Sequence, residues 1–99
     1  MVAPGLHLEF LESAAFAHRI EGNGDLGFQI LELLRNRPYP GELICARIRK
    51  FEFTFSGQDN ALIYGRKDNR ISLMYLYQLP KDEKILEKRC LEIAKGRPS

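Results

Sequence analysis

Apolar and polar residues in the middle of the chain follow the spacing of β-strands. Three runs either alternate or are continuously apolar, and segments rich in Gly, Asn or Asp join them: residues 47–55, 61–64 and 70–77. Successive side chains of a strand point to opposite faces, and Gly, Asn and Asp favour turns. The pattern therefore predicts three strands, each pairing with its neighbour in an antiparallel sheet.

Helical spacing of apolar residues occurs on both sides of these strands. Three helices are expected, over residues 14–21, 26–36 and 82–95. Ser13 and Asp25 can cap the first two, because their side-chain oxygens accept hydrogen bonds from the first turn of a helix. Pro38 is expected to end the second helix, since proline cannot continue one.

A short alternating segment, residues 6–10, predicts one further strand at the start of the chain. The expected element order is β-α-α-β-β-β-α, in an α+β fold with a small antiparallel sheet. A chain of 99 residues buries about two thirds of its unfolded surface, which is enough for one modest core. Residues 1–99 are therefore interpreted as a single domain.

Strand periodicity also predicts which side chains share a face of the sheet. Phe51, Phe53 and Phe55 mark a core face. Regular pairing would put Arg49 on that face, so we expect either a bulge near Arg49 and Lys50 or a strand end that projects beyond the core. In the last strand one face is expected to carry alternate residues of the run: Ile71, Leu73, Tyr75 and Tyr77.

The net charge of +2 conceals an uneven distribution of charge. Residues 1–34 carry one basic and five acidic side chains, whereas residues 35–50 carry five basic side chains and one acidic. A basic region of this kind can attract a polyanion to one face of the molecule. A solvated surface without a partner gives the same composition, so charge leaves both interpretations open.

Several other classes of protein are disfavoured by the sequence. No apolar run approaches the roughly 20 residues that span a bilayer, and no secretory signal is recognisable, so a cytoplasmic location without a membrane is expected. Cys45 and Cys90 lack metal-ligand spacing and are expected to be free thiols, although a disulfide is not excluded. We expect no metal and no cofactor. His7 and His18 lie far from any activated nucleophile.

Basic residues and tyrosines are the chemical groups that remain. Cleavage of RNA to a cyclic phosphate needs a base, an acid and positive charge on the phosphorane, and Lys, Arg and Tyr can supply these. Aromatic rings can also stack on unpaired bases. The alternative is a purely structural role, in which the tyrosines lie at the edge of the core and the arginines keep the protein soluble.

The chain resembles the RelE/HigB superfamily of toxins from bacterial toxin–antitoxin pairs. One motif of the HigB branch, Phe-x-x-Arg-Ile, corresponds to Phe16, Arg19 and Ile20. Six segments follow the family's order: residues 14–20, 30–38, 46–50, 61–65, 70–77 and 81–84. The resemblance implies a RelE-like fold and a ribosome-dependent mRNA endonuclease, inhibited by an antitoxin of the helix-turn-helix type.

The resemblance also implies roles for individual residues. Four basic residues would form the catalytic phosphate site: Arg49, Lys50, Lys81 and Lys84. From the resemblance, Tyr77 would either stack near the mRNA or support the sheet. The other expected RNA contacts come from the basic residues themselves: Arg47, Arg66, Lys67 and Arg70. The family's arginine at the start of the middle strand is Ala61 here, and a basic residue after Lys50 is replaced by Glu52. These departures favour a second hypothesis, a catalytically degenerate module that binds an antitoxin or RNA without cleavage.

Overall fold

A computed structural model describes residues 8–96 of the chain. Five strands form one sheet in the order β1-β5-β4-β3-β2. The strands are β1 (Glu9–Glu12), β2 (Glu42–Cys45), β3 (Ile48–Phe55), β4 (Gln58–Lys67) and β5 (Arg70–Leu79). The helices are α1 (Ala14–Ile20), α2 (Gly24–Asn36) and α3 (Glu83–Ala94). The predicted α+β class is therefore confirmed, with all three helices near their expected places.

The sheet corrects two details of the prediction. β1 pairs with β5 in parallel, with Phe10 opposite Ile71, so the sheet is mixed rather than wholly antiparallel. Residues 42–45 form an additional strand, β2, which pairs with β3 at the edge. The element order is therefore β-α-α-β-β-β-β-α. Sequence periodicity missed β2 because four residues are too short to display alternation.

Helix α1 begins as the sequence predicts, and α2 begins two residues earlier. The Ser13 hydroxyl accepts a hydrogen bond from the Phe16 N–H at 3.0 Å, which confirms Ser13 as the cap of α1. Asn23, rather than Asp25, caps α2 and accepts from the Leu26 N–H at 3.4 Å. Asp25 lies in the first turn instead, where its charge favours the helix dipole.

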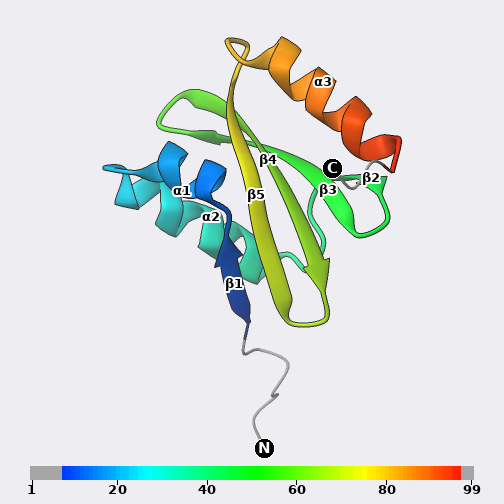
Figure 1. Ribbon diagram of the computed structural model, residues 1–99. Coiled ribbons are helices and arrows are strands. Elements are labelled where there is room, and N and C mark those ends of the chain that lie inside the picture. Colours follow the sequence, from blue (N-terminus) through cyan, green and yellow to red (C-terminus); the bar gives the residue numbers. More distant parts are fainter. Residues whose placement is uncertain (1–7, 97–99) are drawn as a thin grey trace, which may run out of the picture.

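The helices cover opposite faces of the sheet (Figure 1). On one face α1 and α2 build the larger core, in which Phe16, Ile30 and Leu34 pack against Phe51 and Tyr64. On the other face α3 builds a smaller core of four buried residues: Ala61, Ile63, Tyr77 and Leu86. A sheet covered on both sides needs apolar residues on both faces, which explains why residues 61–64 are continuously apolar.

A bulge at Met74 changes which side chains of β5 face which core. Tyr75 lies opposite Ile63 and Leu73 lies opposite Tyr64, so Met74 is the extra residue between two adjacent pairs. Ile71 and Leu73 consequently face the α1–α2 core, whereas Tyr75 and Tyr77 face α3. The prediction that these four side chains share one face is wrong, because it assumed an unbroken alternation.

The first turn of α1 is attached at this bulge. Ser13 donates hydrogen bonds to two carbonyl oxygens of β5, from its N–H to Leu73 and from its hydroxyl to Met74. These contacts satisfy backbone groups beside the irregularity. One residue therefore both caps α1 and fixes the position of that helix against the sheet.

The remaining strand boundaries also differ from expectation. Of the two alternatives for Arg49 and Lys50, a bulge or a strand end beyond the core, the bulge is absent from the β3–β4 pairing, which is regular from Ile48 to Phe55. The register shift lies instead in β2, between Leu43 and Cys45. The loop predicted over residues 56–60 shrinks to a turn at Ser56 and Gly57, and the first strand, predicted over residues 6–10, is Glu9–Glu12. Residues 6 and 7 lie outside the described part of the chain.

None of the described helices is long and apolar enough to cross a membrane.

Candidate functional site

Arg49 and Lys50, the two central members of the predicted catalytic set, point to opposite faces of the sheet. Arg49 lies opposite Tyr64, which belongs to the α1–α2 core. Lys50 lies opposite Ile63, which belongs to the α3 core. Adjacent residues of a regular strand always diverge in this way, so the two cations cannot approach one phosphate from the same side.

Carboxylates surround Lys50 on its own face. Its Nζ lies 3.4 Å from Oε2 of Glu52 and 3.8 Å from Oε1 of Glu42. The ammonium group is therefore already offset by two negative charges. Such a lysine stabilises a phosphate less than an unpaired one would, because the carboxylates repel the same anion.

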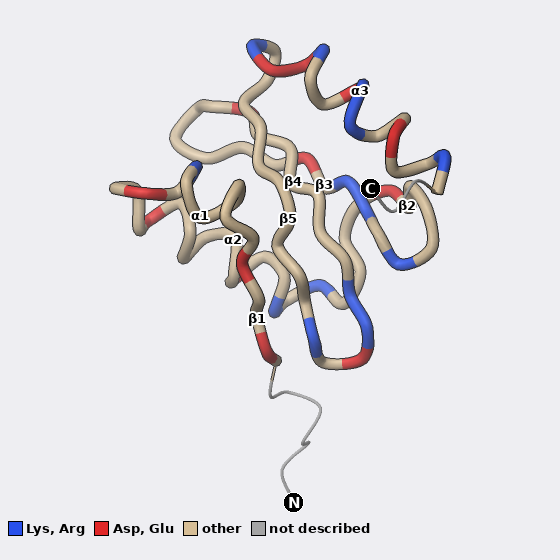
Figure 2. Tube along the Cα trace, viewed as in Figure 1, with Lys and Arg blue, Asp and Glu red and all other residues tan. Residues whose placement is uncertain are grey.

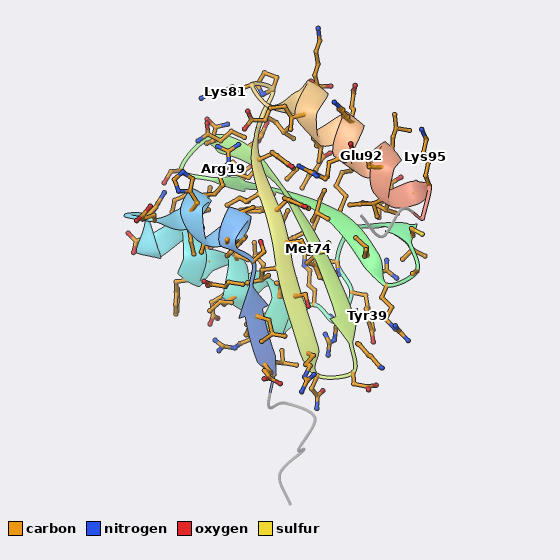
Figure 3. The ribbon with its side chains drawn as sticks, in the orientation of Figure 1. Arg19, Tyr39, Met74, Lys81, Glu92 and Lys95 are labelled. Atoms are coloured by element: carbon orange, nitrogen blue, oxygen red, sulfur yellow. The ribbon has the colours of Figure 1, made fainter. Side chains whose placement is uncertain are left out.

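Lys81 and Lys84 lie at the start of α3, far from Arg49. Figure 3 labels Lys81 at one end of the molecule and Tyr39, which contacts Arg49, at the other. Both lysines are exposed. The structure therefore does not bring together the four residues of the predicted catalytic site.

The predicted RNA-contacting residues divide in the same way. Tyr77 is only 6% exposed, and its hydroxyl accepts a hydrogen bond from Nε of Arg89 at 3.2 Å, so it supports the sheet rather than presenting a ring to solvent. Lys67 and Arg70 are exposed beside the β4–β5 turn, and Arg70 pairs with Glu9 at 3.1 Å. Arg47 is exposed in the turn before β3. Figure 2 shows Lys and Arg gathered at the end of the sheet where β4 turns into β5.

Two of the predicted arginines meet over a tyrosine that the prediction did not include. The guanidinium carbons of Arg49 and Arg66 lie 5.5 and 5.0 Å from the centre of the Tyr39 ring. Tyr39 is 54% exposed. We call the set of Tyr39, Arg49 and Arg66 the basic rim.

Backbone carbonyl oxygens hold both guanidinium groups in place. Arg66 donates from Nη1 to the Pro38 oxygen at 2.7 Å and from Nε to the Asp68 oxygen at 2.8 Å. Arg49 donates from Nη1 to the Gly41 oxygen at 3.3 Å. Neutral acceptors position an arginine without cancelling its charge, so the rim keeps the full positive charge of both groups.

Contacts with the sheet hold the loop of residues 37–41, which carries Tyr39. The hydroxyl of Tyr64, a fully buried side chain, donates to the Pro40 oxygen at 2.6 Å. Burial raises the pKa of Tyr64 to about 12, and the nearby Arg49 and Arg66 oppose part of that rise. Gly41 adopts φ +95°, and its Cα approaches β3 so closely that an added Cβ would lie 2.4 Å from the Lys50 oxygen. The loop is therefore fixed against the sheet at two points.

The chemistry available at the basic rim is binding rather than proton transfer. Arginine stays protonated at any ordinary pH and cannot act as a general base. Two guanidinium groups beside an exposed aromatic ring match a phosphate backbone with an unpaired base. Sequence reasoning missed Tyr39, although its place between Pro38 and Pro40 could have indicated a rigid, exposed loop.

The position that carries an arginine in the RelE/HigB pattern is closed here. Ala61 is fully buried in the α3 core with Leu86 and Ile63. An arginine at this position would have to displace α3 to reach solvent. The packing of α3 on this face therefore leaves no room for an arginine at position 61.

A second group of charged and aromatic side chains lies on the α3 side and was also missed. Arg19 donates from Nη2 to Oδ2 of the buried Asp82 at 2.6 Å. Arg89 lies over the ring of Tyr75, with its guanidinium carbon 4.2 Å from the ring centre. Arg19 and Asp82 are 63 positions apart in the chain, and no local sequence pattern connects them.

Within residues 8–96 no group of three His, Cys, Asp or Glu side chains could hold a metal ion. Neither a protein-family model nor a curated protein matches this chain.

Proposed function

We propose that this chain is a RelE/HigB-like module that binds single-stranded RNA through the basic rim and lacks the cleavage centre expected from the resemblance. The observation that carries the proposal is the meeting of Arg49 and Arg66 over the exposed ring of Tyr39. Because backbone carbonyls hold both arginines, the rim is organised before any ligand arrives. Preorganisation reduces the entropy lost on binding.

Single-stranded RNA suits this surface better than a small anion does. The rim is open, and exposed basic residues extend it toward the β4–β5 turn, where Lys67 lies. A polyanion can contact several such cations in succession, whereas a small anion contacts one or two. The Tyr39 ring can stack on a base of a single strand, which a duplex keeps inside its own base stack.

Cleavage of mRNA on the ribosome is the competing proposal. It requires Lys50, Lys81 and Lys84 to act with Arg49, and these lysines lie on another face or at the other end of the molecule. We therefore favour the non-cleaving module. An antitoxin of the helix-turn-helix type remains a proposed partner, and co-purification with the product of an adjacent gene would test it.

Binding to a fluorescent single-stranded oligoribonucleotide, measured by anisotropy, tests the proposal. Replacing Arg49 and Arg66 by Ala together should weaken binding at least about tenfold, because each charge-assisted contact contributes of the order of 1 kcal/mol or more. Tyr39→Ala should weaken binding by a similar factor through lost stacking. The matched control is Lys84→Ala with Lys88→Ala, which removes two exposed cations from α3 and should change little.

Growth of cells that express the chain alone distinguishes binding from cleavage. Normal growth is expected from a non-cleaving module, whereas intact RNA in the binding samples is expected from both proposals, because the competing nuclease acts on the ribosome. Growth arrest that the Lys81→Ala and Lys84→Ala variant relieves would restore the endonuclease hypothesis. Equal loss of RNA affinity in the rim variant and in the α3 control would overturn the assignment of the rim.

A further inference from the structure

A groove runs between the second half of α3 and the sheet, on the face opposite the basic rim. Its volume is about 1000 Å³. Its walls are mainly apolar, with Ile48 and Met74 from the sheet and Ile93 from α3. Tyr75 and Arg89 lie at its polar side, and Lys95 lies near the end of α3 (Figure 3).

The size and lining of this groove are those of a small-molecule site. Ligand pockets typically enclose roughly 300–1000 Å³, with apolar walls and a few polar groups that fix the orientation of the ligand. The apolar walls here are aliphatic and flexible at Met74, a side chain that adapts to irregular ligands. An aliphatic chain therefore fits the walls better than a rigid planar ring.

The charged groups of the groove indicate the sign of the charge that the ligand carries. Among the described residues that line the groove, Arg89 and Lys95 are cations and Glu92 is the one carboxylate. Arg89 is fixed by three contacts: its Nε donates to the Tyr77 hydroxyl, its Nη1 lies 3.4 Å from Oε1 of Glu92, and its guanidinium carbon lies over Tyr75. Glu92 offsets part of the charge of Arg89, as carboxylates do at Lys50, so Lys95 supplies most of the net positive charge of the described lining, and this charge beside an apolar channel complements an anionic head on an apolar chain.

We propose that this groove binds an aliphatic carboxylate, with its chain along Ile48, Met74 and Ile93 and its head group near Arg89 and Lys95. Each methylene group removed from water favours binding about fourfold, so a chain of medium length can occupy the groove stably. The site is independent of the basic rim, because it lies on the other face of the sheet and shares no residue with it.

Decanoate, used below the concentration at which it forms micelles, is the probe. Methyl NMR of the full chain should show saturable shifts at Ile48, Met74 and Ile93, with little change at Leu26 and Ile30 in the α1–α2 core. Decyltrimethylammonium, which has the same chain and a cationic head, should bind at least tenfold more weakly. Butyrate, with the same head and a short chain, should give no saturable shift.

Lys95→Gln should weaken decanoate binding about two- to fivefold, the range expected for an exposed ion pair. Lys88→Gln is the matched control, since Lys88 is an exposed lysine of α3 that does not line the groove. Met74→Trp, checked for folding by circular dichroism, should fill the groove and abolish binding. RNA affinity should be unchanged in all three variants, so failure here is distinguishable from failure of the proposed function.

Three results would overturn the proposal. Equal binding of decanoate and the cationic amphiphile would remove the role of charge. Shifts spread over both cores would indicate nonspecific partitioning. Association with anionic phospholipid vesicles, without saturable binding of monomeric decanoate, would show that the α3 face contacts a membrane surface instead.

Discussion

At the scale of single residues, neighbours in sequence have unrelated roles. Arg49 extends over Tyr39 on one face of β3, while Lys50 lies among carboxylates on the other. The alternation of a strand separates them, and a motif that reads Arg-Lys in the sequence therefore supplies one cation to each side. Only the arginine, which neutral carbonyls orient, is left with its charge available to a ligand.

Tyr64 makes stability depend on pH in the alkaline range. Burial raises its pKa from 10.0 to about 12 on folding, so its hydroxyl stabilises the fold below pH 10 and this contribution is lost between pH 10 and pH 12. Between pH 8 and pH 11 the loss should amount to about 1 kcal/mol. Urea unfolding at both pH values measures it.

The control for that experiment is Tyr64→Phe. The variant loses the hydrogen bond to the Pro40 oxygen and should be less stable at pH 8. The free energy of unfolding of the variant should nevertheless fall less steeply than that of the wild-type protein as the pH rises. Parallel decline of both proteins would show that other groups cause the alkaline loss.

Gly41 is the second residue on which the rim depends. Gly41→Ala should lower the free energy of unfolding by about 3 kcal/mol or more, because a Cβ would meet the Lys50 oxygen and φ is +95°. Gly57→Ala is the matched control, with φ +77° and no atom within 4 Å, and should cost about 1–2 kcal/mol. Chemical denaturation measures the free energy of unfolding of both variants. Equal losses would mean that the contact between the added Cβ and the Lys50 oxygen is relieved at little cost.

At the scale of elements, the sequence predicted the regular parts and missed the irregular ones. Phe51 marks the core face correctly, Ser13 caps α1 and α2 ends before Pro38 as predicted, whereas the cap of α2 is Asn23 rather than Asp25. The Met74 bulge could not be predicted, because nothing in its apolar surroundings distinguishes an extra residue from an alternating one. Residues 42–45 become strand β2 because they pair with β3, and local sequence propensity does not predict that contact.

Helix α3 is attached to the rest of the fold through Asp82. Its carboxylate accepts hydrogen bonds from the Gln78 N–H at 3.0 Å and from Arg19 of α1. These contacts, first the backbone N–H and then the guanidinium, hold the pKa of Asp82 below its ordinary value of 3.8. The contribution of Asp82 to stability is therefore complete above pH 3.8 and is lost as the pH falls below it.

Asp82→Asn should reduce the free energy of unfolding at pH 7 by about 1–3 kcal/mol, because a buried charged contact is broken. Its stability should also change less than that of the wild-type protein between pH 5 and pH 3. Glu83→Gln, the neighbouring exposed carboxylate, is the control and should be nearly neutral. An acid profile identical to wild type in Asp82→Asn would contradict the assignment.

At the scale of the whole molecule, the net charge is small, but basic and acidic residues gather at different places. Basic residues gather at the β4–β5 end, and acidic residues occur around the α1–α2 turn (Figure 2). The sequence predicted a basic region, since residues 35–50 are rich in arginine. It could not predict which cations meet, because Arg66 joins Arg49 through the β3–β4 pairing and the loop of residues 37–41.

The parallel pairing of β1 with β5 has a consequence for synthesis of the chain. The partners of residues 9–12 are residues 70–73, so β1 is synthesised well before β5, the strand with which it pairs. Until then Phe10 and Leu11 have no sheet to join, and loop closure over such a separation slows folding. Nascent chains stalled before residue 70 should therefore remain sensitive to protease, and the tertiary structure should form late in translation.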